Sequence, residues 1–274
     1  MVIDADVFDE LGDWSQIKHD ILEQYAHAYT TILRRQTFVR RLLYIDAFAG
    51  SGYGVDSETG AQLRGSALRA MQVEPKFDEL HFVEQDEQKA AILEQVSVND
   101  SRVSVHRGDG IAITTQLLDR ARYDDYRRAL CLLDPYDLSV PWSLVERIGE
   151  MRSVEIFYNF MIMDANRNLL WRDPTRVPVD RLQRMDKVWG GREWQDDCYE
   201  EVETLFEPVR RKLTNKAIAE AFRERLRTVA GFKYVPEPIA MKNSNNATVY
   251  YLYFASANQT GARIVNDIFN KYRR

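Results

Sequence analysis

Four acidic residues stand at the ends of runs that read as buried strands, and they are the side chains best placed to do chemistry. The four are Asp46, Glu84, Asp109 and Asp134, at the ends of the first to fourth predicted strands. A single acid in such a place is usually a helix cap. Ligands of doubly wound sheets bind beyond the carboxyl ends of the strands, so four acids in chain order predict one acidic rim around a site.

The first of these strands, Leu42–Ala47, runs into a glycine turn that contains Gly50 and Gly52. Glycine allows a sharp turn and a close approach of the backbone to a ligand. The turn lacks the last glycine of the dinucleotide-binding fingerprint and has an acid, Asp46, beside it. This pattern favours a ligand with a cationic amino-acid end, such as S-adenosylmethionine, over a ligand with phosphates.

The remaining rim acids suit the other parts of such a ligand. The Glu84 carboxylate only accepts hydrogen bonds, which matches the two hydroxyl donors of a ribose. Asp109 could accept a bond from the adenine amine, with Gly110 keeping the backbone clear, although an N-cap of the next helix is an equal alternative for Asp109. Asp46 and the glycine turn would hold the methionine end.

The periodicity of the chain predicts a doubly wound, mostly parallel seven-stranded α/β sheet. A helix over 14–36 and an exposed exit with Arg34, Arg35, Arg40 and Arg41 precede five strands that alternate with helices. Residues 50–64 read as a loop, either a lid or a surface extension. Residues 199–230 read as a long charged helix, and strands over 233–240 and 248–255 form a closing hairpin before a last helix. We expect an N-terminal helical segment, 1–41, and one domain, 42–274.

An insertion over 160–198, directly after the fifth strand, carries basic and aromatic residues side by side. Arg167, Arg172 and Trp171 lie in it, and Asn159 precedes it. Interleaved cations and aromatic rings can bind phosphates and stack on bases, and arginines that pair with local aspartates are the simpler alternative. We interpret Asn159, Arg167 and Arg172 as candidate substrate-binding residues.

Composition excludes several classes. The net charge is −5, no long apolar run is present, and the acidic start of the chain is unlike a signal peptide. Cys131 and Cys198 are isolated, and no spacing of His and Cys residues indicates a metal site. We therefore expect a cytoplasmic protein with no membrane segment and no bound metal.

Several segments together resemble the three-Cys-motif partner proteins, a methyltransferase-like family of bacteria and phages. The segments are Tyr44–Gly52, Phe82–Asp86, Leu132–Tyr136, Glu155–Phe160, the opening Trp14-Ser15-x-x-Lys18 with Tyr25, and the closing Tyr250–Ala255. The resemblance covers most of the chain. It implies a class I methyltransferase fold, an S-adenosylmethionine cofactor held by residues that include Phe48, and a three-Cys-motif protein as partner.

Asp134-Pro135-Tyr136 is similar to the Asp/Asn-Pro-Pro-aromatic signature of methyltransferases that modify exocyclic amines. In that signature the acid accepts a bond from the amine and the aromatic ring stacks on an unstacked base. This chain has one proline, and its aromatic residue comes one place early. Either these three residues are catalytic, or Pro135 and Tyr136 only shape a turn.

The leading hypothesis is an S-adenosylmethionine-dependent methyltransferase that acts on nucleic acid. A non-catalytic docking subunit for a three-Cys-motif partner is the first alternative. A dinucleotide-dependent enzyme on a related sheet is the second, and the missing third glycine argues against it.

Overall fold

A computed structural model describes residues 8–203 and 208–273, so the acidic start of the chain lies outside the described part. Its centre is a seven-stranded sheet in the order β11-β12-β8-β7-β2-β5-β6. The strands are β2 (Arg41–Asp46), β5 (Glu79–Glu84), β6 (Val103–Arg107), β7 (Arg127–Leu133), β8 (Val154–Phe160), β11 (Ile239–Lys242) and β12 (Thr248–Ala255). Five of them are parallel and β12 is antiparallel to both its neighbours, which confirms the predicted mostly parallel sheet.

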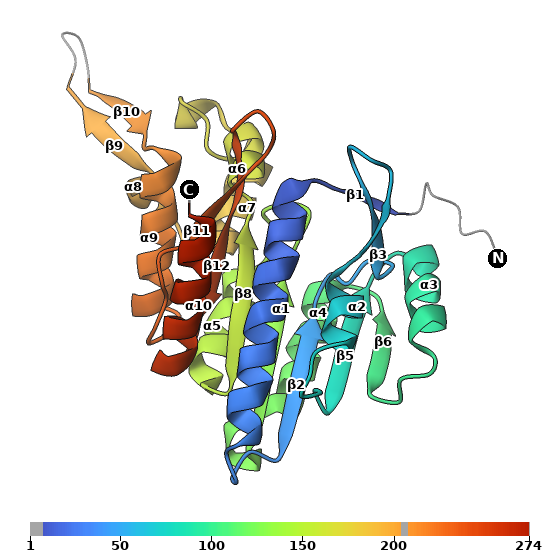
Figure 1. The fold of residues 1–274 in the computed structure, drawn as a ribbon. Coiled ribbons are helices and arrows are strands. Elements are labelled where there is room, and N and C mark those ends of the chain that lie inside the picture. Colours follow the sequence, from blue (N-terminus) through green and yellow to red (C-terminus); the bar gives the residue numbers. More distant parts are fainter. Residues whose placement is uncertain (1–7, 204–207, 274) are drawn as a thin grey trace.

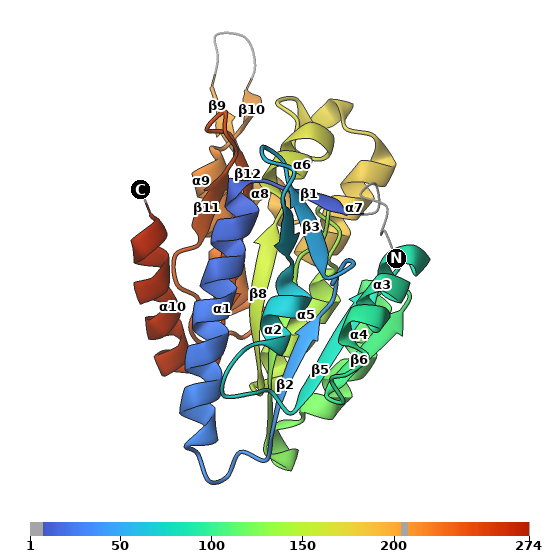
Figure 2. The ribbon, with the colours of Figure 1, turned by 45° about the vertical axis from the view of Figure 1, so that its right-hand side comes forward.

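Helices cover both faces of this sheet (Figures 1 and 2). They are α1 (Asp13–Arg34), α2 (Ser66–Met71), α3 (Glu87–Ser97), α4 (Gly110–Leu117), α5 (Trp142–Met151), α6 (Ile162–Asn168), α7 (Val179–Trp189), α8 (Trp194–Asp197), α9 (Asn215–Thr228) and α10 (Gln259–Tyr272). Apolar side chains of α1, α2, α3 and α10 pack on one face, and those of α4, α5, α7 and α9 on the other. The central strands are buried on both faces, which explains their continuous apolar runs.

The predicted loop over 50–64 is instead a hairpin of β3 (Tyr53–Asp56) and β4 (Gln62–Arg64), so this expectation was wrong. β1 (Asp9–Leu11) adds to the hairpin as a parallel strand beside β3, which makes a separate three-stranded sheet. The pairing between β1 and β3 joins segments more than 40 residues apart in the chain, so local composition could not reveal it.

The predicted long helix over 199–230 was also wrong in its first part. β9 (Tyr199–Val202) and β10 (Val209–Lys212) form an antiparallel pair that projects beyond α8 and α9 (Figure 1). Glu200 lies opposite Arg211, and the two side chains form a salt bridge of 2.7 Å. Alternating charges of this kind suit an exposed strand pair as well as a helix. Residues 204–207 of the predicted helix lie outside the described residues, and α9 begins only after Thr214, whose hydroxyl accepts the Ala217 N–H.

The closing hairpin is confirmed, although its first strand is shorter than predicted. β12 covers 248–255 as expected, whereas β11 begins at Ile239 rather than at 233. Within the described residues, no helix has both the length and the apolar character needed to cross a membrane. The same part of the chain holds no cluster of three or more His, Cys, Asp or Glu side chains arranged for a metal ion.

Candidate functional site

The site is built around the glycine turn that follows β2. Glu84, at the end of β5, accepts the Gly50 N–H at 2.8 Å with one carboxylate oxygen and the Asp86 N–H at 2.7 Å with the other. Gly50 and Gly52 both have left-handed backbones, with φ of 63° and 82°. Glu84 is buried and yet retains lone pairs after these two bonds. The structure thus joins the acid of the second strand to the turn after the first.

Asp46 lies deeper than the sequence suggested. Its side chain is fully buried, accepts the Ser66 hydroxyl at 2.6 Å and the Phe48 N–H at 3.2 Å, and lines neither of the cavities described next. Burial raises the pKa of the Asp46 carboxyl to about 7, and the bond from Ser66 opposes this rise. In this structure Asp46 therefore fixes the start of α2 and the turn from beneath.

The larger of two neighbouring cavities, about 590 Å³, lies over the ends of β5 and β6. Its lining includes Glu84, Asp109 and Gly110. The Asp109 carboxylate accepts the Ala112 N–H at 2.7 Å as the N-cap of α4, which is the structural alternative for this residue, but its side chain stays exposed. A Cβ atom on Gly110 would lie 2.3 Å from the Ala47 carbonyl oxygen, so glycine is what lets α4 begin so close to the turn.

The smaller cavity, about 210 Å³, lies beside the first, over the gap between β2 and β7. This gap is the switch point of the sheet, where the strand order reverses and ligands of such folds bind. Gly50 and Asp134 line the smaller cavity. Phe48, Pro135 and Tyr136 line both cavities. The two spaces therefore meet at these three side chains.

Asp134 is held by two partners from distant parts of the chain. The Lys18 ammonium of α1 and the Asn159 amide of β8 both donate to its carboxylate. Lys18 and Asn159 are buried, whereas the Asp134 side chain is 22% exposed and reaches the smaller cavity. No role for Lys18 was predicted from the sequence, in which its only signal was the opening Trp14-Ser15-x-x-Lys18 pattern.

His19 also lines the smaller cavity. Burial and the neighbouring positive charges of Lys18 and Arg69 lower the pKa of His19 well below its ordinary value of 6.5. The imidazole is therefore neutral at pH 7, and it adds an uncharged polar group to the lining that also contains Asp134.

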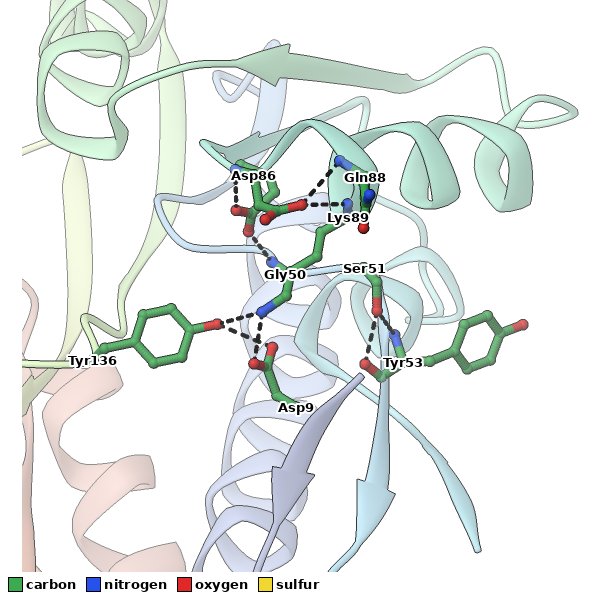
Figure 3. Close-up of polar contacts among 9 residues, drawn as sticks. Asp9, Gly50, Ser51, Tyr53, Asp86, Gln88, Lys89 and Tyr136 are labelled. Atoms are coloured by element: carbon green, nitrogen blue, oxygen red, sulfur yellow. Dashed lines mark hydrogen bonds and ion pairs between the residues drawn. The ribbon is translucent and has the colours of Figure 1, made fainter. Parts of the chain in front are cut away.

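Tyr136 belongs to a polar cluster that ties β1 to the site. Its hydroxyl lies 3.0 Å from an Asp9 carboxylate oxygen and 3.1 Å from the Lys89 ammonium, and Lys89 is 2.6 Å from the other Asp9 oxygen (Figure 3). The Tyr136 ring is exposed, but its hydroxyl is shielded from water within this cluster; this shielding and the Asp9 charge raise the pKa of Tyr136 to about 12, against the effect of Lys89. The cluster links the N-terminal strand, α3 and the Asp-Pro-Tyr turn across the mouth of the cavities.

The arginines of the insertion divide into two groups. Arg184 forms salt bridges to Asp164 at 2.5 Å and Asp137 at 3.0 Å, as the simpler alternative expected. Arg167, on α6, and Arg172 are exposed and form no ion pair among the described residues. Neither of these two arginines lines the cavities, although α6 begins directly after β8 and its preceding residue, Met161, does.

No protein-family model and no curated protein sequence matches this chain. Among solved structures, the Legionella pneumophila protein LPL1258 is similar over 94% of this chain and 92% of its own, with 12% identity and a TM-score of 0.53. A Listeria monocytogenes protein provisionally described as an S-adenosylmethionine-dependent methyltransferase covers 82% of this chain and 96% of its own at 11% identity, with a TM-score of 0.39. The N-terminal domain of EvdMO1, solved with SAH and D-fucose, covers 86% of this chain and 82% of its own at 14% identity, with a TM-score of 0.42.

At such low identity these likenesses concern the fold alone. If the seven strands of the main sheet are numbered in chain order, they lie in the order 3-2-1-4-5-7-6, and the seventh is antiparallel to its neighbours. The chain thus has the doubly wound, mostly parallel seven-stranded α/β fold that its sequence predicts.

Proposed function

We propose that this protein is an S-adenosylmethionine-dependent methyltransferase. One observation supports this most strongly: two cavities meet at the switch point of the sheet, the larger lined by Glu84 and the smaller by Asp134. The larger has acceptors for a nucleoside, and the smaller has an acceptor for the group to be modified. This arrangement suits a cofactor and a second substrate that touch at Phe48 and Pro135.

The residues present fit the cofactor. Glu84 has lone pairs left for ribose hydroxyls, and Asp109 is exposed in the same cavity for the adenine amine. Gly110 leaves room that a Cβ would fill, and Phe48 forms part of the wall. Gly50 and Gly52 bring backbone to the neighbouring cavity, where the methionine end would lie. Asp46 would support this loop rather than touch the ligand, because its oxygens face Ser66 and Phe48.

The chemistry proposed is methyl transfer to an amine nitrogen. The bound cofactor would supply an electrophilic methyl group on a sulfonium; the S–CH3 bond would break as the N–CH3 bond forms, the cofactor would leave as the neutral thioether, and the amine would release one proton to water. Asp134 would accept a hydrogen bond from the amine and turn its lone pair toward that methyl group, while Lys18 and Asn159 fix the carboxylate. Such positioning can contribute about 7–11 kcal/mol to a reaction. Tyr136, which is exposed, would pack against the ring that carries the amine.

We propose nucleic acid as the substrate that brings this amine. An unstacked base has both an exocyclic amine and a flat face for Tyr136. Arg167 and Arg172, exposed and without ion pairs in the described part of the chain, would contact its phosphates from the insertion beside β8. The protein would work in the cytoplasm, in keeping with the free, buried Cys131 and Cys198.

We further propose membership of the three-Cys-motif partner proteins and a three-Cys-motif protein as partner. The motifs behind this resemblance converge in the structure: Lys18 from the opening pattern contacts Asp134, and Tyr250 from the closing hairpin lines the same cavity as both. Segments that share one site support a resemblance better than segments scattered over the surface.

Incubation of the protein with methyl-labelled cofactor and single-stranded DNA or RNA tests the proposed reaction. We expect labelled nucleic acid, with Asp134→Ala lowering the rate at least about 100-fold because the amine loses its positioned acceptor. Asp134→Ala should bind the cofactor nearly as the wild type does. Asp119→Ala, which removes an exposed carboxylate paired with Arg147, is the matched control.

The same assay separates the alternatives. Cofactor binding without turnover, with and without the three-Cys-motif partner, would favour a docking subunit over an enzyme. Binding of a nicotinamide dinucleotide in preference to S-adenosylmethionine would favour a dinucleotide-dependent enzyme over a methyltransferase.

A further inference from the structure

The candidate site lies at the carboxyl ends of the strands. A second unusual surface lies at the other end of the sheet, where the strands begin. Among the described residues only four aromatic side chains are largely exposed, and three of them, Phe38, Tyr123 and Tyr126, lie at this edge. Phe38 is in the connection from α1 to β2, and the two tyrosines precede β7 (Figure 1, lower end). β2 and β7 are neighbours in the sheet, which brings the two connections together.

Each of these rings has a guanidinium group over its face. Arg128 lies 4.1 Å from the ring centre of Tyr123 and 5.9 Å from that of Phe38. The Arg40 guanidinium lies 5.3 Å from the ring centre of Tyr126, and the backbone N–H of Arg40 donates to the Tyr126 carbonyl at 2.9 Å. The rings are therefore held in place while one side of each stays open, as a stacking platform requires.

This end of the sheet has a surplus of exposed positive charge although the whole chain carries −5. Five exposed arginines here form no ion pair among the described residues: Arg35, Arg40, Arg41, Arg122 and Arg152. The acids nearby are Asp124, Asp125, Glu150 and the buried Glu155, whereas Asp78 and Glu79 at the start of β5 are already paired with other arginines. Arg41 even lies directly opposite Arg127 across the two strands, a like-charge pairing that costs stability. Such a cluster is expected where a polyanion binds.

A cavity of about 800 Å³ opens between these rings and the body of the protein. Phe38, Tyr123 and Arg128 line it on one side. Tyr29 and Ser153 line it from within, and their buried hydroxyls have no hydrogen-bond partner among the described residues. Buried polar groups are normally paired, so these two hydroxyls point to a ligand with donors or acceptors on its edge.

We propose that this surface, which we call the amino-edge surface (Phe38, Arg40, Tyr123, Tyr126, Arg128 and Arg152), binds single-stranded nucleic acid. Unpaired bases stack on the three rings, one base edge reaches the hydroxyls of the cavity, and the free arginines contact phosphates. A duplex hides its base faces and cannot use the rings. The surface is separate from the methyl-transfer site, because strands of six or seven residues place the two edges roughly 20 Å apart. Nucleic acid is also the proposed substrate of the methyl-transfer site, but binding at the amino-edge surface does not require methyl transfer.

Fluorescence anisotropy with labelled oligothymidylate, at several salt concentrations and without cofactor, tests this inference. The critical variant combines Phe38→Ala with Tyr123→Ala, and its conservative counterpart combines Phe38→Tyr with Tyr123→Phe. Arg227→Ala, which removes one exposed positive charge from α9, is the control for charge.

We expect the alanine double variant to bind at least about fivefold more weakly, because one stacked base accounts for about a five- to 150-fold change in affinity. The conservative variant and Arg227→Ala should bind like the wild type. Arg40→Ala should lower the salt dependence of the affinity by about one phosphate contact. A duplex should bind more weakly than the single strand. No binding by the wild-type protein, or equal binding by the wild type and the alanine variant, would overturn the inference and leave the surface to a protein partner.

The result can be read independently of the enzymatic proposal. The same titration with Asp134→Asn should give wild-type affinity, because Asp134 lies at the other edge of the sheet. A protein that binds the oligonucleotide through the amino-edge surface and yet transfers no methyl group would support this inference alone, and loss of binding in Asp134→Asn would contradict the separation of the two sites.

Discussion

At the scale of single residues, the four acids that follow predicted strands have different roles in the structure. Glu84, Asp109 and Asp134 line the two cavities, and Asp109 also caps α4, whereas Asp46 is buried beneath the turn. The sequence could place all four at one edge, because strand ends follow from hydrophobic runs. It could not predict which oxygens face solvent, since that depends on partners such as Lys18, 116 residues from Asp134 in the chain.

Lys18→Met tests the pairing at Asp134. We expect the free energy of unfolding to fall by about 3 kcal/mol, because the change leaves a half-buried carboxylate with an amide as its only described partner. Chemical denaturation measures this loss. Adding Asp134→Asn should restore part of the stability, because no unpaired carboxylate is then left in the site. A double variant no more stable than Lys18→Met would show that the ion pair does not account for the loss.

At the scale of elements, two strand pairs were missed for one physical reason. β3–β4 and β9–β10 are short and polar, and their order comes from pairing rather than from burial of a periodic face. β1 reaches β3 only through the folded chain, and the Asp9, Lys89 and Tyr136 cluster then connects it to α3. The buried strands and long amphipathic helices, by contrast, follow directly from hydrophobic periodicity.

Gly110→Ala tests how closely α4 must approach the turn. The new methyl group would lie 2.3 Å from the Ala47 carbonyl oxygen, so the start of the helix must move. We expect a loss of about 1–3 kcal/mol in unfolding free energy and weaker cofactor binding, measured by denaturation and calorimetry. Gln116→Ala, an exposed change in the same helix and outside the cavity lining, should alter neither. An unchanged affinity in Gly110→Ala would argue against the larger cavity as the nucleoside site.

At the scale of the whole molecule, a buried carboxyl group makes stability depend on pH. Glu155 of β8 accepts hydroxyl bonds from Tyr25 of α1 and from Ser256 after β12, so it joins three parts of the fold. Burial raises the pKa of Glu155 to about 7, against the two bonds. Between pH 4.5 and 7 the unfolded chain therefore releases a proton that the folded chain keeps, and the free energy of unfolding falls as pH rises through this window.

Glu155→Gln removes this titration. Relative to the glutamine variant, the wild-type protein should lose on the order of 3 kcal/mol of unfolding stability between pH 5 and pH 8, with no further loss above that. Denaturation of both proteins at several pH values measures the difference. If the difference in unfolding free energy between the two proteins stayed constant from pH 5 to pH 8, this would contradict a raised pKa of Glu155 in the folded state.

Calorimetry with S-adenosylmethionine tests the central claim, that the cavity lined by Glu84 over the strand ends binds the nucleoside of this cofactor. We predict binding by the wild type, with Glu84→Ala at least about tenfold weaker, because the ribose loses a charged acceptor and the Gly50 amide loses its partner. Glu87→Ala, which removes an exposed carboxylate on α3, should bind like the wild type. No binding by the wild type, or the same affinity in Glu84→Ala, would contradict the account.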